Sequence, residues 1–391
     1  MRIIGQWILP VAIMLDAAIA LSQVANPDLI AQAKKEGRVV WYTTVSIPES
    51  KQFVDMFEKQ YPFIKVDLLR SGSGALVNRL VSEYAAKNYS VDVMQGTSSR
   101  GGFTALKQRN ILGRYESPEH KFLAPELKDK NGYWASSFLN TFVLGYNKRN
   151  VKPDDVPKTY DDLLKPMWKG RQIINDTENF EWFDGLLKSW GRDKGIAYFR
   201  RLAQQDQIFQ RGARGRIQLV AAGEAPLTIG YGPHAQSFVN QGAPIEWVPL
   251  EPVVTIVSTT SIAQRPPHPA AAKLFIDFLF SKAAQLKLRE MSRIPARSDV
   301  EPDPPRLMKG FKRVVQDVEN ENMAESTKLF QQIFGLAPGG GFVPVQTVPP
   351  DDDRAVRSYV GCVISRRQRD VLLGGKRRRK GASQEEGARN Q

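Results

Sequence analysis

The sequence predicts a two-lobed α/β protein, and three observations support that prediction. Its 391 residues exceed what one compact hydrophobic core usually holds. Its composition, with 42% hydrophobic and 25% charged residues, is that of a globular protein and not of a disordered or fibrous one. After an apolar leader, short β-branched segments alternate with amphipathic ones, which is the pattern of a mainly parallel, doubly wound sheet.

The N-terminus predicts export from the cytoplasm. Arg2 precedes a mostly apolar run over residues 3–21, which ends in the small-residue sequence Ala18-Ile19-Ala20. This arrangement is typical of a signal peptide, so we expect residues 1–20 to be removed, with cleavage after Ala25 as the second possibility. An uncleaved anchor and a buried helix are the alternatives, because Asp16 interrupts the run.

The rest of the chain agrees with export. No later apolar stretch reaches about twenty residues, so no transmembrane helix is expected after the leader. The only cysteine, Cys362, lies near the C-terminus, and avoidance of thiols suits an exported protein. Since no cysteine stands at the predicted mature N-terminus, we expect no lipid anchor.

The first lobe is predicted to begin at residues 26–141. Its strands are rich in β-branched and aromatic residues, and its helices carry apolar residues three or four positions apart. We predict strands at 39–42, 65–69 and 91–94, and helices at 49–61, 75–87 and 103–108.

The second lobe is predicted at residues 142–249, and residues 250–335 return to the first lobe and add C-terminal helices. A strand at 142–146 carries the chain across. We predict further strands at 171–174, 227–231, 245–250 and 253–257, and helices at 160–164, 182–190, 194–204, 218–222, 268–281, 283–291 and 309–334.

Residues 336–391 are expected to form a disordered basic tail, because they lack sustained periodicity. From Leu336 onward, eleven Lys and Arg residues against six acidic residues give 11 − 6 = +5 of the total charge of +14. The remaining +9 is dispersed, which slightly favours anionic ligands or an anionic membrane surface and does not predict a nucleic-acid partner.

The candidate binding residues follow the predicted strands. In open α/β sheets, ligands bind beyond the carboxyl ends of strands, where helix N-termini present free N–H groups. The loops at these places are rich in Ser, Thr, Gly and Arg, which suit an anionic or oxygen-rich ligand. The candidates are Tyr42, Thr43, Thr44, Ser71, Gly72, Ser73, Gly74, Ser98, Asn175, Asp176, Arg211 and Tyr231.

No catalytic constellation is present in the sequence. The three histidines, His120, His234 and His268, have no metal-ligand spacing, and neither a Gly-x-Ser-x-Gly motif nor a Walker-type loop occurs. We therefore expect a non-enzymatic protein without a cofactor. A transferase-like enzyme, with Asp176 and Glu178 as its only candidate acids, and a sensory receptor domain are the alternatives.

Several segments together resemble the bacterial extracellular solute-binding proteins of ABC importers, the group that includes the periplasmic ferric-ion-binding proteins. The likeness extends from about residue 28 to residue 300. The most specific stretch is His268-Pro269-Ala270-Ala271-Ala272-Lys273-Leu274-Phe275-Ile276-Asp277-Phe278-Leu279-Phe280-Ser281, followed by Arg293-Ile294-Pro295-Ala296-Arg297. Shorter matches are Val39-Val40-Trp41-Tyr42-Thr43, Arg70-Ser71-Gly72-Ser73-Gly74 and Gly223-Glu224-Ala225-Pro226.

The resemblance implies a type II periplasmic-binding-protein fold, in which two lobes joined by crossover strands close on a ligand. It also implies a monomer that delivers its ligand to an ABC permease in the inner membrane. Ferric members hold the metal with two adjacent tyrosines, often helped by a His or Glu. Here Tyr231 stands alone between two glycines. The expected ligand is therefore a small anion, and Fe(III) bound by Tyr231 is the alternative.

Overall fold

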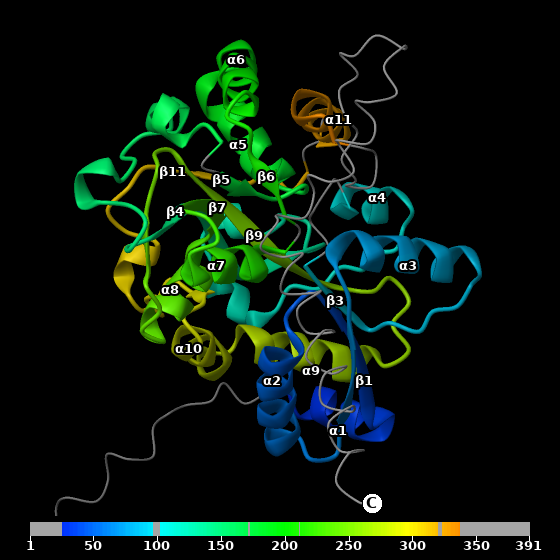
Figure 1. Ribbon diagram of the computed structural model, residues 1–391. Helices are drawn as coiled ribbons and strands as arrows, with labels where there is room; N and C mark the ends of the chain where they lie inside the picture. Colours follow the sequence, from blue (N-terminus) through cyan, green and yellow to red (C-terminus); the bar gives the residue numbers. More distant parts are fainter. Residues whose placement is uncertain (1–25, 97–101, 171–172, 211, 320–322, 337–391) are drawn as a thin grey trace, which may run out of the picture. The chain divides into compact units, whose positions relative to one another are not determined.

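The computed structural model describes residues 26–96, 102–170, 173–210, 212–319 and 323–336 (Figure 1). The predicted signal peptide lies outside these residues, and so does the predicted tail except for Leu336. All described residues belong to one structural unit. Among them, no helix has the length and apolar character that crossing a membrane requires.

The first part of the chain folds into the predicted alternation of strands and helices. β1 pairs in parallel with β2 on one side and with β3 on the other. The six elements predicted between residues 39 and 108 are all present, and α1 precedes them. The elements are α1 (Pro27–Glu36), β1 (Arg38–Thr43), α2 (Ile47–Gln60), β2 (Lys65–Arg70), α3 (Ser73–Ala85), β3 (Val93–Gln95), α4 (Gly102–Gln108), and the 3-10 turns η2 (Pro118–Phe122) and η3 (Pro125–Leu127).

Two long antiparallel strands, β4 (Ala135–Asn147) and β9 (Val253–Ile262), connect the lobes. Residues 135–141 of β4 pair with residues 255–260 of β9, whereas residues 142–146 pair with β7 (Leu227–Tyr231). The strand order is β2-β1-β3-β9-β4-β7-β5-β6, in which β5 is Ile173–Asn175 and β6 is Ile208–Phe209. Each lobe is therefore completed by a strand that continues into the other lobe, which confirms the predicted two-lobed fold with crossover strands.

The prediction found only the second half of β4. Its first half contains Ser136, Ser137 and Asn140, and residues of these types are poor indicators of a strand. Pairing on both sides, with β9 and with β10, stabilises this half in spite of its composition.

The second lobe contains a parallel pairing of β5 with β6 and with β7. The helix predicted at 160–164 is a single 3-10 turn. The helix α8 (Gly232–Asn240) was not predicted, because its Gly-Pro start is typical of a loop. Proline is nevertheless tolerated in the first turn of a helix. The elements are η4 (Pro153–Asp155), η5 (Asp161–Leu164), η6 (Pro166–Trp168), β5 (Ile173–Asn175), α5 (Phe180–Trp190), α6 (Arg192–Ala203), β6 (Ile208–Phe209), α7 (Ala213–Ala222), β7 (Leu227–Tyr231), α8 (Gly232–Asn240) and β8 (Ile245–Val248).

The prediction of helix over residues 309–334 is wrong in its first half. Residues 313–315 form a strand that pairs in parallel with the edge of β9, and of the described residues in this range only 323–334 are helical. The two valines of this strand favour extended structure once an unpaired edge is available. The last elements are α9 (Pro269–Phe280), α10 (Lys282–Glu290), β10 (Ile294–Pro295), η7 (Pro305–Leu307), β11 (Arg313–Val315) and α11 (Met323–Phe334).

The buried side chains form two hydrophobic clusters. In the first, Phe275 of α9 packs edge-on against Trp41 of β1 and Phe57 of α2, with ring centroids 5.1 and 4.9 Å apart. In the second, Phe330 of α11 packs against Phe180 and Phe183 of α5 at 5.2 and 5.5 Å. The last helix therefore belongs to the core that α5 and α6 form (Figure 1).

The start of α9 is fixed by two carboxylates from distant parts of the chain. Asp92 is fully buried, and it accepts hydrogen bonds from the backbone N–H groups of Val40 and His268 at 2.7 Å each. Its second contact with His268 is to Nδ1 at 2.8 Å. Glu36 accepts from the N–H groups of Ala270 and Ala271 at 3.1 and 2.7 Å. The His-Pro-Ala-Ala signature is therefore a helix start held by acids, and His268 has a structural role.

Replacement of Asp92 by alanine should lower the free energy of unfolding by about 3 kcal/mol, because two buried N–H groups and an imidazole lose their acceptor. Urea unfolding at pH 7 measures this difference. Asp55→Ala provides a matched control, since Asp55 lies exposed on α2. Equal stabilities of the two variants would contradict the assigned role of Asp92.

Candidate ligand-binding site

The parallel strands of both lobes end beside the same stretch of the crossover strands. β3 ends at Gln95, which lies opposite Thr260 of β9. β7 ends at Tyr231, which lies opposite Phe142 of β4. Residues 136–141 of β4 therefore lie between the two sets of strand ends. Because ligands of open α/β sheets bind beyond the carboxyl ends of the strands, this region is the candidate site.

The middle of the crossover strands is polar although it is buried. Asn140, Thr141, Ser258 and Thr259 are all at most 7% exposed. The hydroxyl groups of Thr141, Ser258 and Thr259 make no hydrogen bond within the described part of the chain. Such groups normally find a water or ligand partner, since a buried hydroxyl without one costs about 1–3 kcal/mol.

Two of the predicted residues of the first lobe have structural partners. The Tyr42 hydroxyl donates to Glu83 at 3.1 Å on α3, and Tyr42 is only 3% exposed. The Thr43 hydroxyl donates to Gln95 at 2.8 Å, and Gln95 donates in turn to Ser137 at 2.7 Å. These hydrogen bonds connect β1 to α3 and to the crossover strands. Both side chains therefore stabilise the framework of the first lobe.

Thr44 is the first partly exposed residue after β1. It lies against Gly96, where a Cβ atom would come within 2.0 Å of the Thr44 hydroxyl. Gly96 also has a φ of +80°, so only glycine fits at this position. The close approach brings the loops after β1 and β3 together at the border of the candidate site.

The loop after β2 leads directly into α3. Ser71, Ser73 and Gly74 are partly exposed and Gly72 is exposed. No side chain caps the helix, and the hydroxyl oxygen of Ser73 is buried without a partner among the described residues. Nothing lies within 4 Å of the position that a Cβ would take at Gly72 or Gly74. The N-terminus of α3 is therefore open to a ligand.

The predicted residues after β5 form a hydrogen-bonded corner. Asn175 accepts from Asp176 N at 2.8 Å and from the side chain of Asn179 at 2.5 Å. Asp176 accepts from Gly212 N at 3.2 Å and forms an ion pair with the fully buried Arg216. The corner fixes the start of α7 against the end of β5.

Thr177 is the residue of this corner that remains available to a ligand. It is 7% exposed, and its hydroxyl has no partner in the described ranges. α5 begins three residues later, and its N-cap residue provides no capping hydrogen bond. The helix dipole and the free N–H groups of such a terminus attract anions.

Tyr231 ends β7 and packs edge-on against Phe142, with ring centroids 5.1 Å apart. Its hydroxyl makes no hydrogen bond to any residue that the structure describes. Burial, followed by the negative charges of Glu181 and Asp176, raises the pKa of Tyr231 above its ordinary value of 10.0. The neutral phenol is therefore favoured, and it can donate a hydrogen bond to a ligand oxygen.

An ion pair beside the site was not predicted from the sequence. Arg293, which follows α10, donates from Nε and Nη2 to the two carboxylate oxygens of Glu49 at 2.9 and 2.8 Å. Nη1 contacts Asn140 of β4 at 3.4 Å. Burial alone would raise the pKa of Glu49, but the charge and hydrogen bonds of Arg293, helped by Ser46, lower it to about 2.

His234 was also missed, although it follows Tyr231 by three positions at the start of α8. Its ring centroid lies 5.6 Å from that of Tyr231, and its Nδ1 has no hydrogen-bond partner among the described residues. Burial and the charge of Arg293 lower the pKa of His234 to about 3. Helical spacing from Tyr231 was the one signal in the sequence that pointed to it.

Two predicted site residues, Ser98 and Arg211, lie outside the described residues. Their roles stay predictions. Within the ranges that the structure describes, no group of three or more His, Cys, Asp or Glu residues could hold a metal ion. Tyr231 is therefore not joined there by a ready-made metal cluster of these types.

Comparison with known proteins identifies the family. The sequence profile of the family described as bacterial extracellular solute-binding protein matches residues 87–318. The chain belongs to this family. This membership confirms the class of protein that the sequence resemblance implied.

One curated relative in the comparison is iron uptake protein A1 of Synechocystis sp. The solute-binding protein described here is 27% identical to it over 248 residues, which cover 58% of this chain and 67% of the relative.

Solved structures confirm the periplasmic-binding-protein fold. Iron-bound HitA from Pseudomonas aeruginosa superposes with a TM-score of 0.67 at 19% identity, over 76% of this chain and 99% of that chain. AfuA from Actinobacillus pleuropneumoniae, with fructose-6-phosphate bound, gives 0.65 at 23% identity, over 76% and 97% of the two chains. At these identities the likeness concerns the fold alone.

The Glu49–Arg293 pair should make stability depend on pH in acid. A carboxylate whose pKa is lowered from 4.5 to about 2 stabilises the fold fully above pH 4.5, and this contribution is lost as the pH falls toward 2. Glu49→Gln should therefore be up to about 3 kcal/mol less stable than wild type at pH 7. The two should converge near pH 2 in urea unfolding.

Glu58→Gln on the same helix is the matched control for Glu49. Glu58 pairs with Lys65 at the surface, with Lys65 71% exposed, so its loss should cost less than about 1 kcal/mol. A constant stability difference between Glu49→Gln and wild type from pH 2 to pH 7 would contradict the assigned ion pair.

His234 should remain neutral from pH 5 to pH 8, because its pKa is about 3. Its imidazole C–H signals in NMR spectra, assigned by comparison with His234→Gln, should not shift over this range. A titration with a midpoint between pH 5 and pH 8 would show that His234 is not buried beside Arg293.

Proposed function

We propose that this solute-binding protein is the periplasmic component of an ABC importer and that it binds a small anionic, oxygen-rich ligand between its lobes. The observation that supports the proposal is a set of buried hydroxyl groups without partners among the described residues, which follow the ends of parallel strands or line the middle of the crossover strands. Thr177 follows β5, Ser73 follows β2, and Tyr231 ends β7, while α3 and α5 begin without side-chain caps.

The charges of the site favour a ligand that is recognised through its oxygen atoms. Arg216 is neutralised by Asp176, and Arg293 is neutralised by Glu49. Selection then rests on hydroxyl groups and on helix N-termini, which donate hydrogen bonds to phosphate, phosphonate or carboxylate oxygens. The solved relative AfuA, which holds fructose-6-phosphate, is compatible with this ligand class.

Fe(III) is the second candidate ligand, and it belongs to the same transport function. Relatives named for iron uptake and for Fe(3+) binding favour it, and the Tyr231 hydroxyl is available. Against it, Tyr231 has no adjacent tyrosine.

The proposed role is transport and not catalysis. Asp176, one of the two acids considered for an enzyme, is already engaged by Arg216 and by Gly212. We further propose that the protein acts as a monomer, that its leader is cleaved on export, that closure of the lobes presents the ligand to a membrane permease, and that nucleic acid is not a partner.

Native mass spectrometry of the protein purified from periplasm tests the ligand class. A bound mass that matches a phosphorylated, phosphonate or carboxylate compound, at one copy per chain, is the expected result. A bound mass of one iron atom would move the proposal to the ferric ligand. Turnover of the bound compound would overturn the transport role.

Replacement of Tyr231 by phenylalanine, and of Thr177 by valine, should each weaken binding of that ligand about tenfold, since each variant removes one hydrogen bond to a charged group. Isothermal titration calorimetry measures the loss. Tyr146→Phe is the matched control, because Tyr146 lies at the far end of the β4–β7 pairing. Unchanged affinity in both site variants would show that the ligand binds elsewhere.

A further inference from the structure

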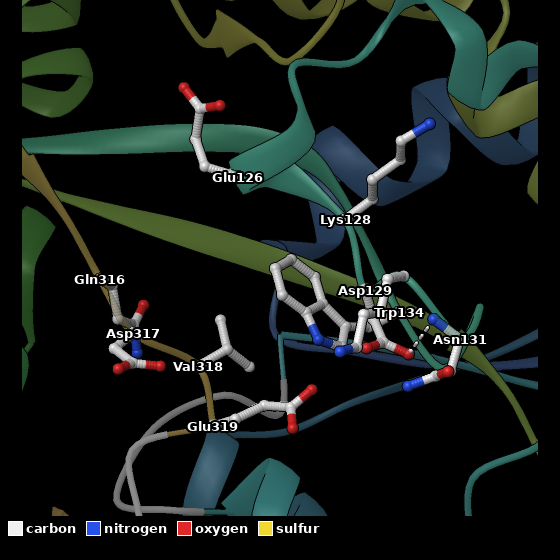
Figure 2. A pocket seen from close by; sticks show the side chains of 10 residues that line it. Glu126, Lys128, Asp129, Asn131, Trp134, Gln316, Asp317, Val318 and Glu319 are labelled. Carbon is white, nitrogen blue, oxygen red and sulfur yellow. Dashed lines mark hydrogen bonds between the residues drawn. The ribbon is translucent and has the colours of Figure 1, made fainter.

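A second pocket, with a volume of about 370 Å³, shares no lining residue with the candidate site (Figure 2). This volume is within the range of small-molecule sites, which is roughly 300–1,000 Å³. One wall is the segment that leads into β4, and the other is the segment that follows β11. The residues of the two walls are Glu126, Lys128, Asp129, Lys130, Asn131 and Trp134, and Gln316, Asp317, Val318 and Glu319.

The pocket contains two buried donors that lack acceptors. Trp134 is 8% exposed, and its indole packs edge-on against Phe103 at 6.1 Å. Its Nε1–H has no partner among the described residues, and Figure 2 shows the indole lying between the two walls. A buried N–H group without an acceptor is costly, so a ligand oxygen placed here would be stabilised.

The second donor is the side-chain amide of Gln316, whose orientation is set by the crossover strand. Gln316 N donates to Thr255 O at 2.8 Å, and Gln316 Oε1 accepts from Val257 N at 3.3 Å. With its oxygen used in this way, the amide leaves Nε2 buried and without a partner in the described part of the chain. Trp134 and Gln316 therefore line the same pocket, and each has a donor without an acceptor among the described residues.

The rim of the pocket carries carboxylates that remain partly available. Glu319 bonds to Lys107 of α4 at 2.8 Å through Oε2, and Asp317 bonds to Lys188 of α5 at 3.3 Å through Oδ2. Asp129 accepts two backbone N–H groups through Oδ2. The other oxygen of each carboxylate makes none of these bonds, so the rim can accept hydrogen bonds from an ammonium group.

We propose that this pocket is a second ligand site, for a small zwitterion of the α-amino-acid class. The carboxylate of the ligand would accept from Trp134 Nε1 and Gln316 Nε2, and its ammonium group would donate to the rim carboxylates. Val318, which is 4% exposed, and the face of Trp134 offer an apolar surface to the side chain of the ligand. Asp129, Asp317 and Glu319 each have a cationic or N–H partner, which suits a ligand with no net charge.

The site is separate from the one proposed for the transported anion. None of its lining residues is among those that border the ends of β1, β2, β5 or β7. Gln316 nevertheless connects the second site to β9 through its hydrogen bonds to Thr255 and Val257. A ligand in the second site would therefore contact a residue that is bonded to a crossover strand. Failure of this proposal therefore leaves the transport function untouched, and the reverse also holds.

L-leucine is the probe, because its side chain suits the apolar surface. Calorimetry with the full chain should show binding of one L-leucine. Binding should be at least about tenfold weaker for 3-methylbutylamine, which lacks the carboxylate, and for 4-methylpentanoate, which lacks the amino group. Equal binding of either analogue would overturn the zwitterion assignment, and no binding of L-leucine would overturn the proposal.

Two variants locate the binding. Trp134→Phe keeps an aromatic ring against Phe103 and removes the N–H group, and Gln316→Glu keeps the acceptor for Val257 N and removes the amide donor. Each should weaken L-leucine binding about tenfold. Trp41→Phe is the matched control, because the indole N–H of Trp41 also lacks a partner among the described residues but lies in the core.

The outcome distinguishes the two sites even if one variant fails to fold, which thermal unfolding monitored by circular dichroism would reveal. Loss of binding in either folded pocket variant, with Tyr231→Phe unaffected, supports the second site. Unchanged binding in the folded pocket variants, or loss in Tyr231→Phe alone, would place L-leucine elsewhere and refute the assignment.

Discussion

The antiparallel pairing of β4 with β9 is the constraint on which the rest of the structure depends. Each strand begins in one lobe and ends in the other, so the sheets of both lobes share one hydrogen-bonded register. That register brings the end of β3, at Gln95, and the end of β7, at Tyr231, to the same few residues of β4. A shift of one residue would turn the polar face of these strands over, which would separate the donors that define the site.

The chemistry of the candidate site follows from the ion pairs that its charged residues form with each other. Both buried arginines beside the site are engaged by carboxylates, Arg216 by Asp176 and Arg293 by Glu49. Breaking such a pair would leave a buried charge without compensation, so the pairs hold the walls rigidly. The groups left to recognise a ligand are neutral donors and helix ends. This arrangement suits a binding protein, which must hold its ligand firmly and release it unchanged.

Some of the predicted ligand-binding residues also have hydrogen-bond partners within the protein. Tyr42 and Thr43 follow the binding pattern, yet their hydroxyls are used within the protein, by Glu83 and by Gln95. The His268 signature was strong evidence for the family, and its physical basis is the capping of α9 by Asp92 and Glu36. Neither acid is near His268 in sequence, so only the fold reveals why the signature exists.

The alternation of strands and helices, the two lobes and the family were determined by the sequence itself, because periodic burial and strand-end loops are local features. The tertiary structure decided what depends on pairing between distant segments. The first half of β4 and the strand β11 form because β9 offers them a partner, and composition alone pointed elsewhere. Arg293 and His234 join the site for the same reason. Their neighbours, Glu49 and Tyr231, are brought to them by α2, α8 and the crossover strands. The residues next to a side chain in the sequence do not reveal its partner when that partner is distant in the chain and is brought close only by folding.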